Sequence, residues 1–160
     1  MANHCYNYVS FSGNKEILIE LKEAIVEAEA ASNDKYFYQF CDRVVKADPG
    51  VKKDYLFYGT KWFEYEIDHQ GDTMCMQGDS AWGPPQRFVE AMCKQYGLCA
   101  ILEYEEPGND FAGIIKYDST GEMKSLLIMS FNTILTFTIG KKKFLTCMMT
   151  LKTIQKLKNI

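Results

Sequence analysis

The first hydrophobic pattern in the chain is an alternation near the amino end. Between residues 4 and 12, apolar and aromatic side chains occupy every second position of an extended chain. One side carries Cys5, Val9 and Phe11, and the other carries Tyr6 and Tyr8. Because successive side chains of a strand point to opposite faces, the pattern predicts a β-strand that ends at Gly13-Asn14.

Two later segments have helical rather than strand periodicity. From Asn14, a plausible N-cap, apolar residues recur every three or four positions as far as Ala28, with glutamates on the other faces. A second apolar stripe runs from Phe88 to Tyr96, after Pro84-Pro85 and before Gly97. Proline favours the first turn of a helix and glycine its end, so both segments are predicted as amphipathic helices.

The remaining patterns predict a hairpin and a meander. Residues 61–67 and 73–77 are predicted as strands around a loop at 69–72, and strands are also predicted at 98–104, 111–117 and 123–129. Residues 135–139 alternate like a strand, and residues 146–157 have loose helical spacing. For residues 36–40 the pattern does not decide between an extended chain and a helix.

This order of elements predicts an α+β fold of the split βαβ kind, with a mainly antiparallel sheet and two helices packed on one face. Charge then separates the chain into two parts. Residues 1–140 carry a net charge of −9, whereas residues 141–160 hold six lysines and no acidic residue. We therefore predict a domain over residues 1–131 and a basic C-terminal extension over 132–160.

Composition bears on location and on cysteine chemistry. The longest apolar stretch, 126–139, is interrupted by serine, asparagine and threonine, so no membrane helix is expected. The amino end lacks a basic leader and a long apolar run, and a cytoplasmic protein is expected. In that reducing compartment the six cysteines should remain thiols. No closely spaced Cys or His pair indicates a metal site, and no cofactor is expected.

Four ordered segments resemble the YubB ferredoxin-like domain family of phage, plasmid and mobile-element proteins. The resemblance covers roughly residues 1–117. It implies a ferredoxin-like topology without an iron-sulfur cluster, and it implies no general activity. The segments that carry it are residues 1–13, Tyr58-Gly59-Thr60-Lys61-Trp62, Ala81-Trp82-Gly83-Pro84-Pro85 and residues 104–113.

The same segments supply the candidate ligand-binding residues, which are Tyr58, Lys61, Trp62, Trp82, Glu105 and Asn109. The aromatic rings would stack on a ligand, the lysine would meet an anionic group, and Glu105 or Asn109 would contact a sugar or base edge. The alternative is that both tryptophans belong to the core and that Gly59 merely turns the chain. The acidic groups at 64–68 and 103–106 could converge as acid-base or magnesium-binding carboxylates, or could form the wet face of the sheet.

No catalytic residue is identified, so the leading hypothesis is a non-enzymatic accessory protein of a phage or mobile element. It would sequester a small nucleotide-type signalling molecule or inhibit a host defence protein. A small lyase or hydrolase that acts on an adenine-containing metabolite at a subunit interface is the alternative. A homo-oligomer is expected because an open aromatic sheet face is costly to expose. Nucleic acid is a weak partner hypothesis, because the acidic body repels phosphates.

Overall fold

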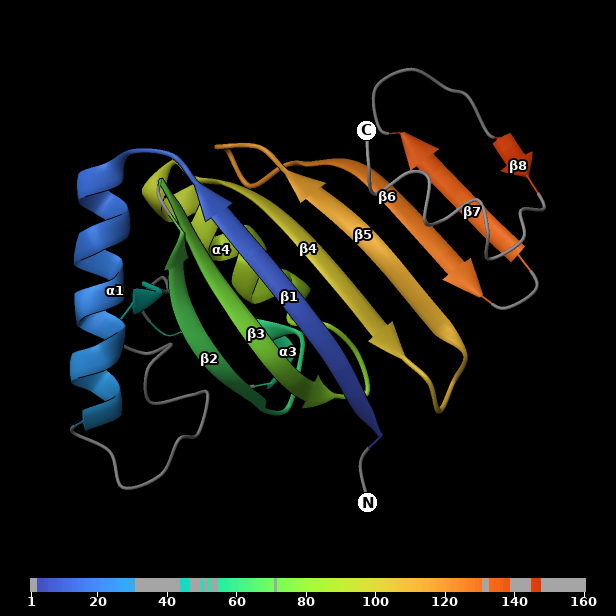
Figure 1. The fold of residues 1–160 in the computed structure, drawn as a ribbon, viewed down its shortest axis with the longest axis horizontal. Helices are drawn as coiled ribbons and strands as arrows, with labels where there is room; N and C mark the ends of the chain where they lie inside the picture. Colours follow the sequence, from blue (N-terminus) through green and yellow to red (C-terminus); the bar gives the residue numbers. More distant parts are fainter. Residues whose placement is uncertain are drawn as a thin grey trace.

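The computed structural model describes residues 3–30, 44–46, 50, 52, 55–70, 72–130, 133–138 and 145–147. Within these ranges the strands form one eight-stranded sheet in the order β2-β3-β1-β4-β5-β6-β7-β8 (Figure 1). Every neighbouring pair in the sheet is antiparallel. The first strand of the chain therefore lies inside the sheet, between two strands that come much later in the sequence.

The elements match the predicted order closely. The strands are β1 (His4–Ser12), β2 (Phe63–Gln70), β3 (Thr73–Ala81), β4 (Cys99–Glu106), β5 (Phe111–Tyr117), β6 (Met123–Ser130), β7 (Thr133–Thr138) and β8 (Leu145–Cys147). The helices are α1 (Lys15–Ala30), α3 (Tyr55–Tyr58) and α4 (Gln86–Tyr96). The Asn14 side chain accepts a hydrogen bond from the Ile17 backbone at 3.1 Å, and Gly97 ends α4 in the left-handed conformation. Both predicted helix boundaries are thus confirmed.

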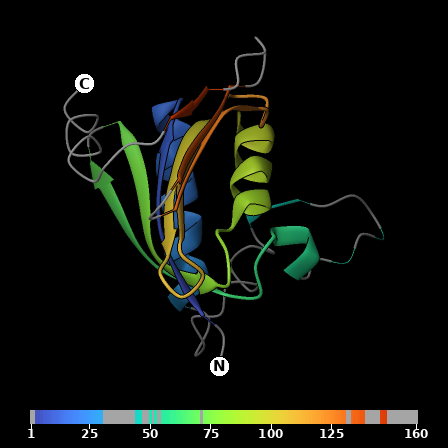
Figure 2. The same ribbon diagram turned by 90° about the vertical axis from the view of Figure 1, so that its right-hand side faces the viewer.

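The core lies between one face of the sheet and the two long helices. Phe11 from β1, Ile25 from α1 and Phe88 from α4 belong to one buried cluster. Both helices therefore cover the same face, and Figure 2 shows α4 lying along one side of the sheet. This arrangement confirms the predicted α+β ferredoxin-like fold with two helices on one face.

At the carboxyl end of the sheet, the strand predicted from the alternation at 135–139 is confirmed as β7, but the sheet differs there from the other predictions. β7 pairs with β6 and β8 pairs with β7, so the sheet continues beyond the predicted boundary at residue 131. Thr146 and Cys147 lie in β8, where helical spacing was predicted. The remainder of the stretch to residue 157 and the undecided residues 36–40 lie outside the described residues. The helical prediction for Thr146 and Cys147 failed for a physical reason. A segment with a weak helical pattern pairs as a strand where the unpaired edge of a sheet offers backbone hydrogen bonds.

The hairpin between β2 and β3 is tighter than predicted, because β2 extends to Gln70 and includes half of the expected loop. The longest helix of the described residues has 16 residues, and no described helix is long and apolar enough to cross a membrane.

The other face of the sheet carries acidic and aromatic side chains. No described helix covers the face of β2, β3, β1 and β4 that is turned toward the viewer in Figure 1. On β1 the side chains of Tyr6 and Tyr8 are 48% and 37% exposed on this face. In register with Tyr6 are Asp79 on β3 and Glu105 on β4, and Glu64 follows on β2. Directly paired residues of antiparallel strands share a face, so Tyr6 lies between two carboxylates, whereas Tyr8 lies between Gln77 on β3 and Glu103 on β4.

We predict that Gly78→Ala disrupts the β2–β3 pair. A Cβ atom at position 78 would lie 1.9 Å from the backbone oxygen of Glu64, which cannot move without opening the sheet. The expected loss in the free energy of unfolding, measured by urea denaturation, exceeds about 2 kcal/mol. Gly83→Ala is the matched control, because a Cβ atom there meets nothing within 4 Å. Equal stability of the two variants would contradict the described register.

Candidate functional site

A shallow hollow of about 300 Å³ lies where β1 begins and β4 ends. Two segments far apart in sequence form its wall. Residues Asn3, His4 and Tyr6 come from the start of β1, and Glu106, Pro107 and Gly108 come from the end of β4 and the turn after it. Because β1 and β4 are antiparallel neighbours, the amino end of one strand meets the carboxyl end of the other at this point. The hollow combines aromatic rings with a carboxylate and an amide.

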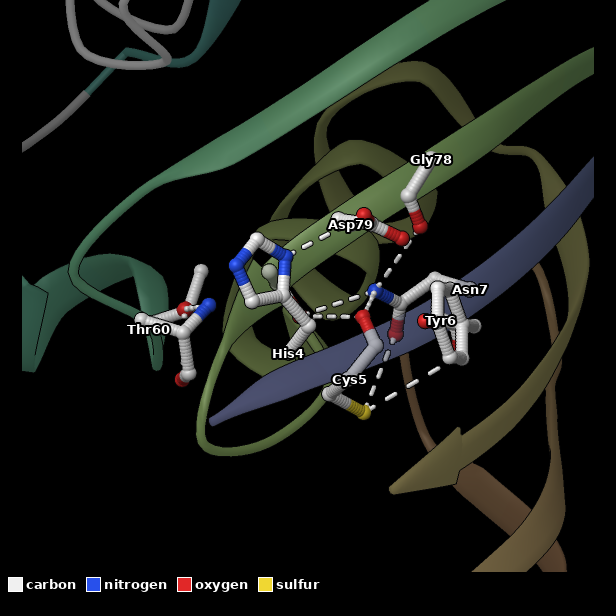
Figure 3. Close-up of polar contacts among 9 residues, drawn as sticks. His4, Cys5, Tyr6, Asn7, Thr60, Gly78 and Asp79 are labelled. Carbon is white, nitrogen blue, oxygen red and sulfur yellow. Dashed lines mark hydrogen bonds and ion pairs between the residues drawn. The ribbon is translucent and has the colours of Figure 1, made fainter. Parts of the chain in front are cut away.

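His4 links the hollow to the indole ring of Trp62. The two ring centroids are 5.1 Å apart in an edge-on arrangement, and Trp62 is half-buried. On its other side the His4 Nδ1 atom lies 3.2 Å from the Asp79 carboxylate, as Figure 3 shows. These two contacts hold the imidazole at the rim of the hollow, where sequence reasoning assigned it no role.

Trp82 is joined to the same region by its backbone. Its N–H donates a hydrogen bond to the carbonyl of Asn3 at 2.9 Å, while its side chain is 54% exposed. Its φ of 59° lies in the left-handed region, which is rare for so bulky a residue. Such strained positions persist only where the surrounding structure holds them, and they concentrate at binding and active sites.

Glu106 is the most unusual residue at the hollow, because its side chain is completely buried. Its Oε2 atom accepts a hydrogen bond from the backbone N–H of Asn109. Its Oε1 atom has no hydrogen-bond partner among the described residues. A buried carboxylate oxygen without a donor is costly and therefore uncommon. The sequence contains a signal for it: Leu102, Tyr104 and Glu106 occupy the inward positions of β4, so a charged residue replaces the expected apolar one.

The structure brings only part of the predicted site together. Tyr58 is wholly buried in the core, so its ring cannot stack on a ligand. The close approach that Gly59 allows is to α4, since a Cβ atom there would lie 3.3 Å from the backbone nitrogen of Arg87. The hydroxyl of Thr60 accepts a hydrogen bond from the N–H of Ala81 at 3.1 Å. Gly59 and Thr60 thus support the strand that begins at Phe63.

The other predicted residues lie on the surface around the hollow. The side chains of Lys61, Glu105 and Asn109 are exposed, and Trp62 and Trp82 are at least partly so. Glu105 lies beside Tyr6 in the sheet register, and Asn109 contacts Glu106 through its backbone. None of these five side chains lines the hollow itself.

The acidic groups on β2 and β4 do not converge. Strands β3 and β1 lie between them in the sheet, which places β2 and β4 roughly 14 Å apart. Glu64, Glu66 and Glu105 are exposed on the open face. These carboxylates form a solvent-exposed face, which was the alternative interpretation of the alternating pattern. The carboxylates on β2 lie too far from those on β4 to act as one acid-base pair or to bind one magnesium ion.

A second hollow of about 240 Å³ lies further along the open face, lined by Tyr8, Glu66, Ile67, Asp68, Cys75 and Gln77. The Tyr8 hydroxyl donates to the Cys75 sulfur at 3.0 Å, and this bond raises the pKa of Tyr8 above its ordinary value. In the described part of the chain, no three His, Cys, Asp or Glu side chains gather as a metal-binding group.

Comparison with known proteins supports the fold. Residues 56–133 match a family model described as a ferredoxin-like domain in Api92-like protein. The match covers the chain from α3 to the start of β7, and it includes Lys61, both tryptophans, Glu105 and Asn109. No curated protein and no solved structure gives a significant match to the chain. The fold is thus ferredoxin-like, and the YubB resemblance stays a prediction.

We predict that alkylation will distinguish the thiols. Burial raises the pKa of Cys5 and of Cys93 to about 12, whereas Cys99 is exposed. Because the thiolate is the reactive form, iodoacetamide at pH 8 should modify Cys99 at least roughly tenfold faster than Cys5 or Cys93. Peptide mass spectrometry measures the rates, and urea should abolish the difference. Equal rates in the folded protein would contradict the described core.

Proposed function

We propose that the protein is a non-enzymatic binding protein that captures a small nucleotide-type molecule in the hollow between β1 and β4. The observation that carries this proposal is a hollow lined both by His4 and Tyr6 and by Glu106, one of whose carboxylate oxygens has no hydrogen-bond partner among the described residues. Small-molecule sites are concave and combine apolar or aromatic walls with a few placed polar groups. A volume of about 300 Å³ is at the lower end of their range.

The rings around the hollow favour a planar ligand. Tyr6 is 48% exposed, so its ring is available to a ligand at the surface. The His4 ring, which contacts Trp62 edge-on, adds a second aromatic surface beside it. Stacking of a base on an aromatic side chain contributes about 1–3 kcal/mol per base. A base could lie against Tyr6 at the mouth of the hollow, and Trp82, whose backbone is joined to Asn3, could cover the ligand from outside.

We predict that a thermal-shift screen will identify the ligand class. The panel contains cyclic nucleotides, ADP-ribose derivatives and adenosyl compounds. A ligand at a hundred times its dissociation constant should raise the melting temperature by roughly 5–10 °C. Tyr6→Ala should weaken binding by roughly tenfold or more, because it removes the stacking surface.

The matched control for this test is Tyr8→Ala. Tyr8 lies two residues along the same strand on the same face, and it lines the second hollow instead. The Tyr8→Ala variant should therefore bind the same ligand as tightly as the wild-type protein does. If no panel compound stabilises the protein, or if both variants lose binding equally, the proposed hollow is wrong. Mass spectrometry of the recovered ligand separates capture from turnover, because the lyase or hydrolase alternative requires a product.

A second candidate function is the inhibition of a host defence protein through the open sheet face. The observation that favours it is the set of exposed carboxylates around Tyr6 and Tyr8. Complementary charge steers a basic partner toward such a face and sets the orientation of binding. In this hypothesis the protein would act in the cytoplasm of a host cell, as a monomer or as the expected homo-oligomer.

We predict that co-purification from host cells will then depend on these charges. Glu64→Gln, Glu66→Gln and Glu103→Gln together should weaken capture of the partner by roughly tenfold, and salt should weaken it further. The control is Glu16→Gln with Glu20→Gln, which changes charge on α1 and leaves the open face intact. Identical recovery by both variants would exclude this face.

A further inference from the structure

We propose that Glu106 and Asn3 select a base that carries an amino group next to a ring nitrogen, as adenine and cytosine do. This inference rests on the proposed function and names the class of ligand that the hollow would take. It starts from Glu106, which has no exposed surface and only one of its two carboxylate oxygens hydrogen-bonded among the described residues.

The two oxygens of Glu106 have different surroundings. Oε2 is fixed by the backbone N–H of Asn109 in the turn after β4. Oε1 remains as a single acceptor, and a carboxylate oxygen can be satisfied only by a donor. A ligand that donates a hydrogen bond to Oε1 would remove the cost of leaving a buried carboxylate oxygen unpaired.

Gly108 shows which group lies next to this acceptor. A Cβ atom at position 108 would be 2.8 Å from Oε1 of Glu106 and also 2.8 Å from Nδ2 of Asn3. Nothing larger than a hydrogen atom fits at this position, so the acceptor and an amide donor border the same point in the wall of the hollow. Oε1 itself has no exposed surface, so a ligand reaches it only when the exposed side chain of Asn3 turns aside.

A neighbouring acceptor and donor are complementary to an amino group beside a ring nitrogen. The amino group would donate to Oε1 of Glu106, and the ring nitrogen would accept from Asn3; amide side chains recognise adenine in the same way in nucleic-acid complexes. An oxo-bearing base places an acceptor against Oε1, and two acceptors repel.

The test compares nucleosides that differ in this one group. Wild-type protein should bind adenosine roughly 10- to 100-fold more tightly than inosine, and cytidine more tightly than uridine. Glu106→Gln should abolish the preference. The amide oxygen of the new side chain must accept from the N–H of Asn109, so its NH₂ group takes the place of Oε1 and repels the amino group of adenosine, while the ring N–H of inosine still meets the Asn3 donor.

Glu105→Gln is the matched control, since it removes the same charge from the adjacent exposed residue and leaves Glu106 in place. It should keep the wild-type order of ligands. Isothermal titration measures the affinities, and melting curves verify that each variant folds. If Glu106→Gln does not fold, the wild-type comparison alone decides.

Two outcomes separate this inference from the function on which it depends. If a panel compound binds but wild-type protein does not distinguish adenosine from inosine or cytidine from uridine, the role of Glu106 and Asn3 is overturned while capture stands. If no compound of either set binds, both proposals fail. Loss of the preference in a folded Glu106→Gln variant that still binds inosine and uridine is a result that a purely structural role for Glu106 would not produce.

Discussion

The rest of the structure depends on the pairing of β1 with strands on both of its sides. This nine-residue strand forms antiparallel ladders with β3 and with β4. A strand inside a sheet cannot shift its register by one residue without moving its buried side chains to the solvent face. Cys5, Val9 and Phe11 are fully buried in the core, so their burial fixes the opposite orientation of Tyr6 and Tyr8.

That constraint also fixes a polar cluster inside the sheet. Asn7 takes an inward position on β1, where its amide donates to the carbonyl of Cys5 at 2.7 Å (Figure 3). The same amide donates to the hydroxyl of Ser80 at 2.8 Å. Buried polar groups that are fully hydrogen-bonded help to specify a single register. Glu106 is the contrast, because it is also buried but one of its oxygens has no hydrogen-bond partner in the described part of the chain. This difference between the two residues makes the end of β4 the candidate site.

The candidate site could be predicted from the sequence only in part. The segments that hold Trp62, Trp82 and Glu105 do lie near one another, because β2, β3, β1 and β4 are consecutive neighbours in the sheet. Tyr58 could not be excluded beforehand, since an aromatic residue beside a glycine fits a binding loop as well as a short helix that packs on the core. Asn3 and His4 were missed, and Glu106 was considered only among the acidic groups at 103–106, because the three residues meet only through the pairing of β1 with β4.

The sequence by itself determined the local structure and the layer arrangement of this protein. Periods of two and of three to four residues, with proline and glycine at the helix ends, are short-range properties that the residues in each segment settle. Only the tertiary structure decided the order of the strands, the inclusion of β7 and β8 in the sheet, and the meeting of Glu106 with Asn3 at one hollow. These features depend on which distant segments compete for the same hydrogen bonds and the same core volume, and no local pattern records that competition.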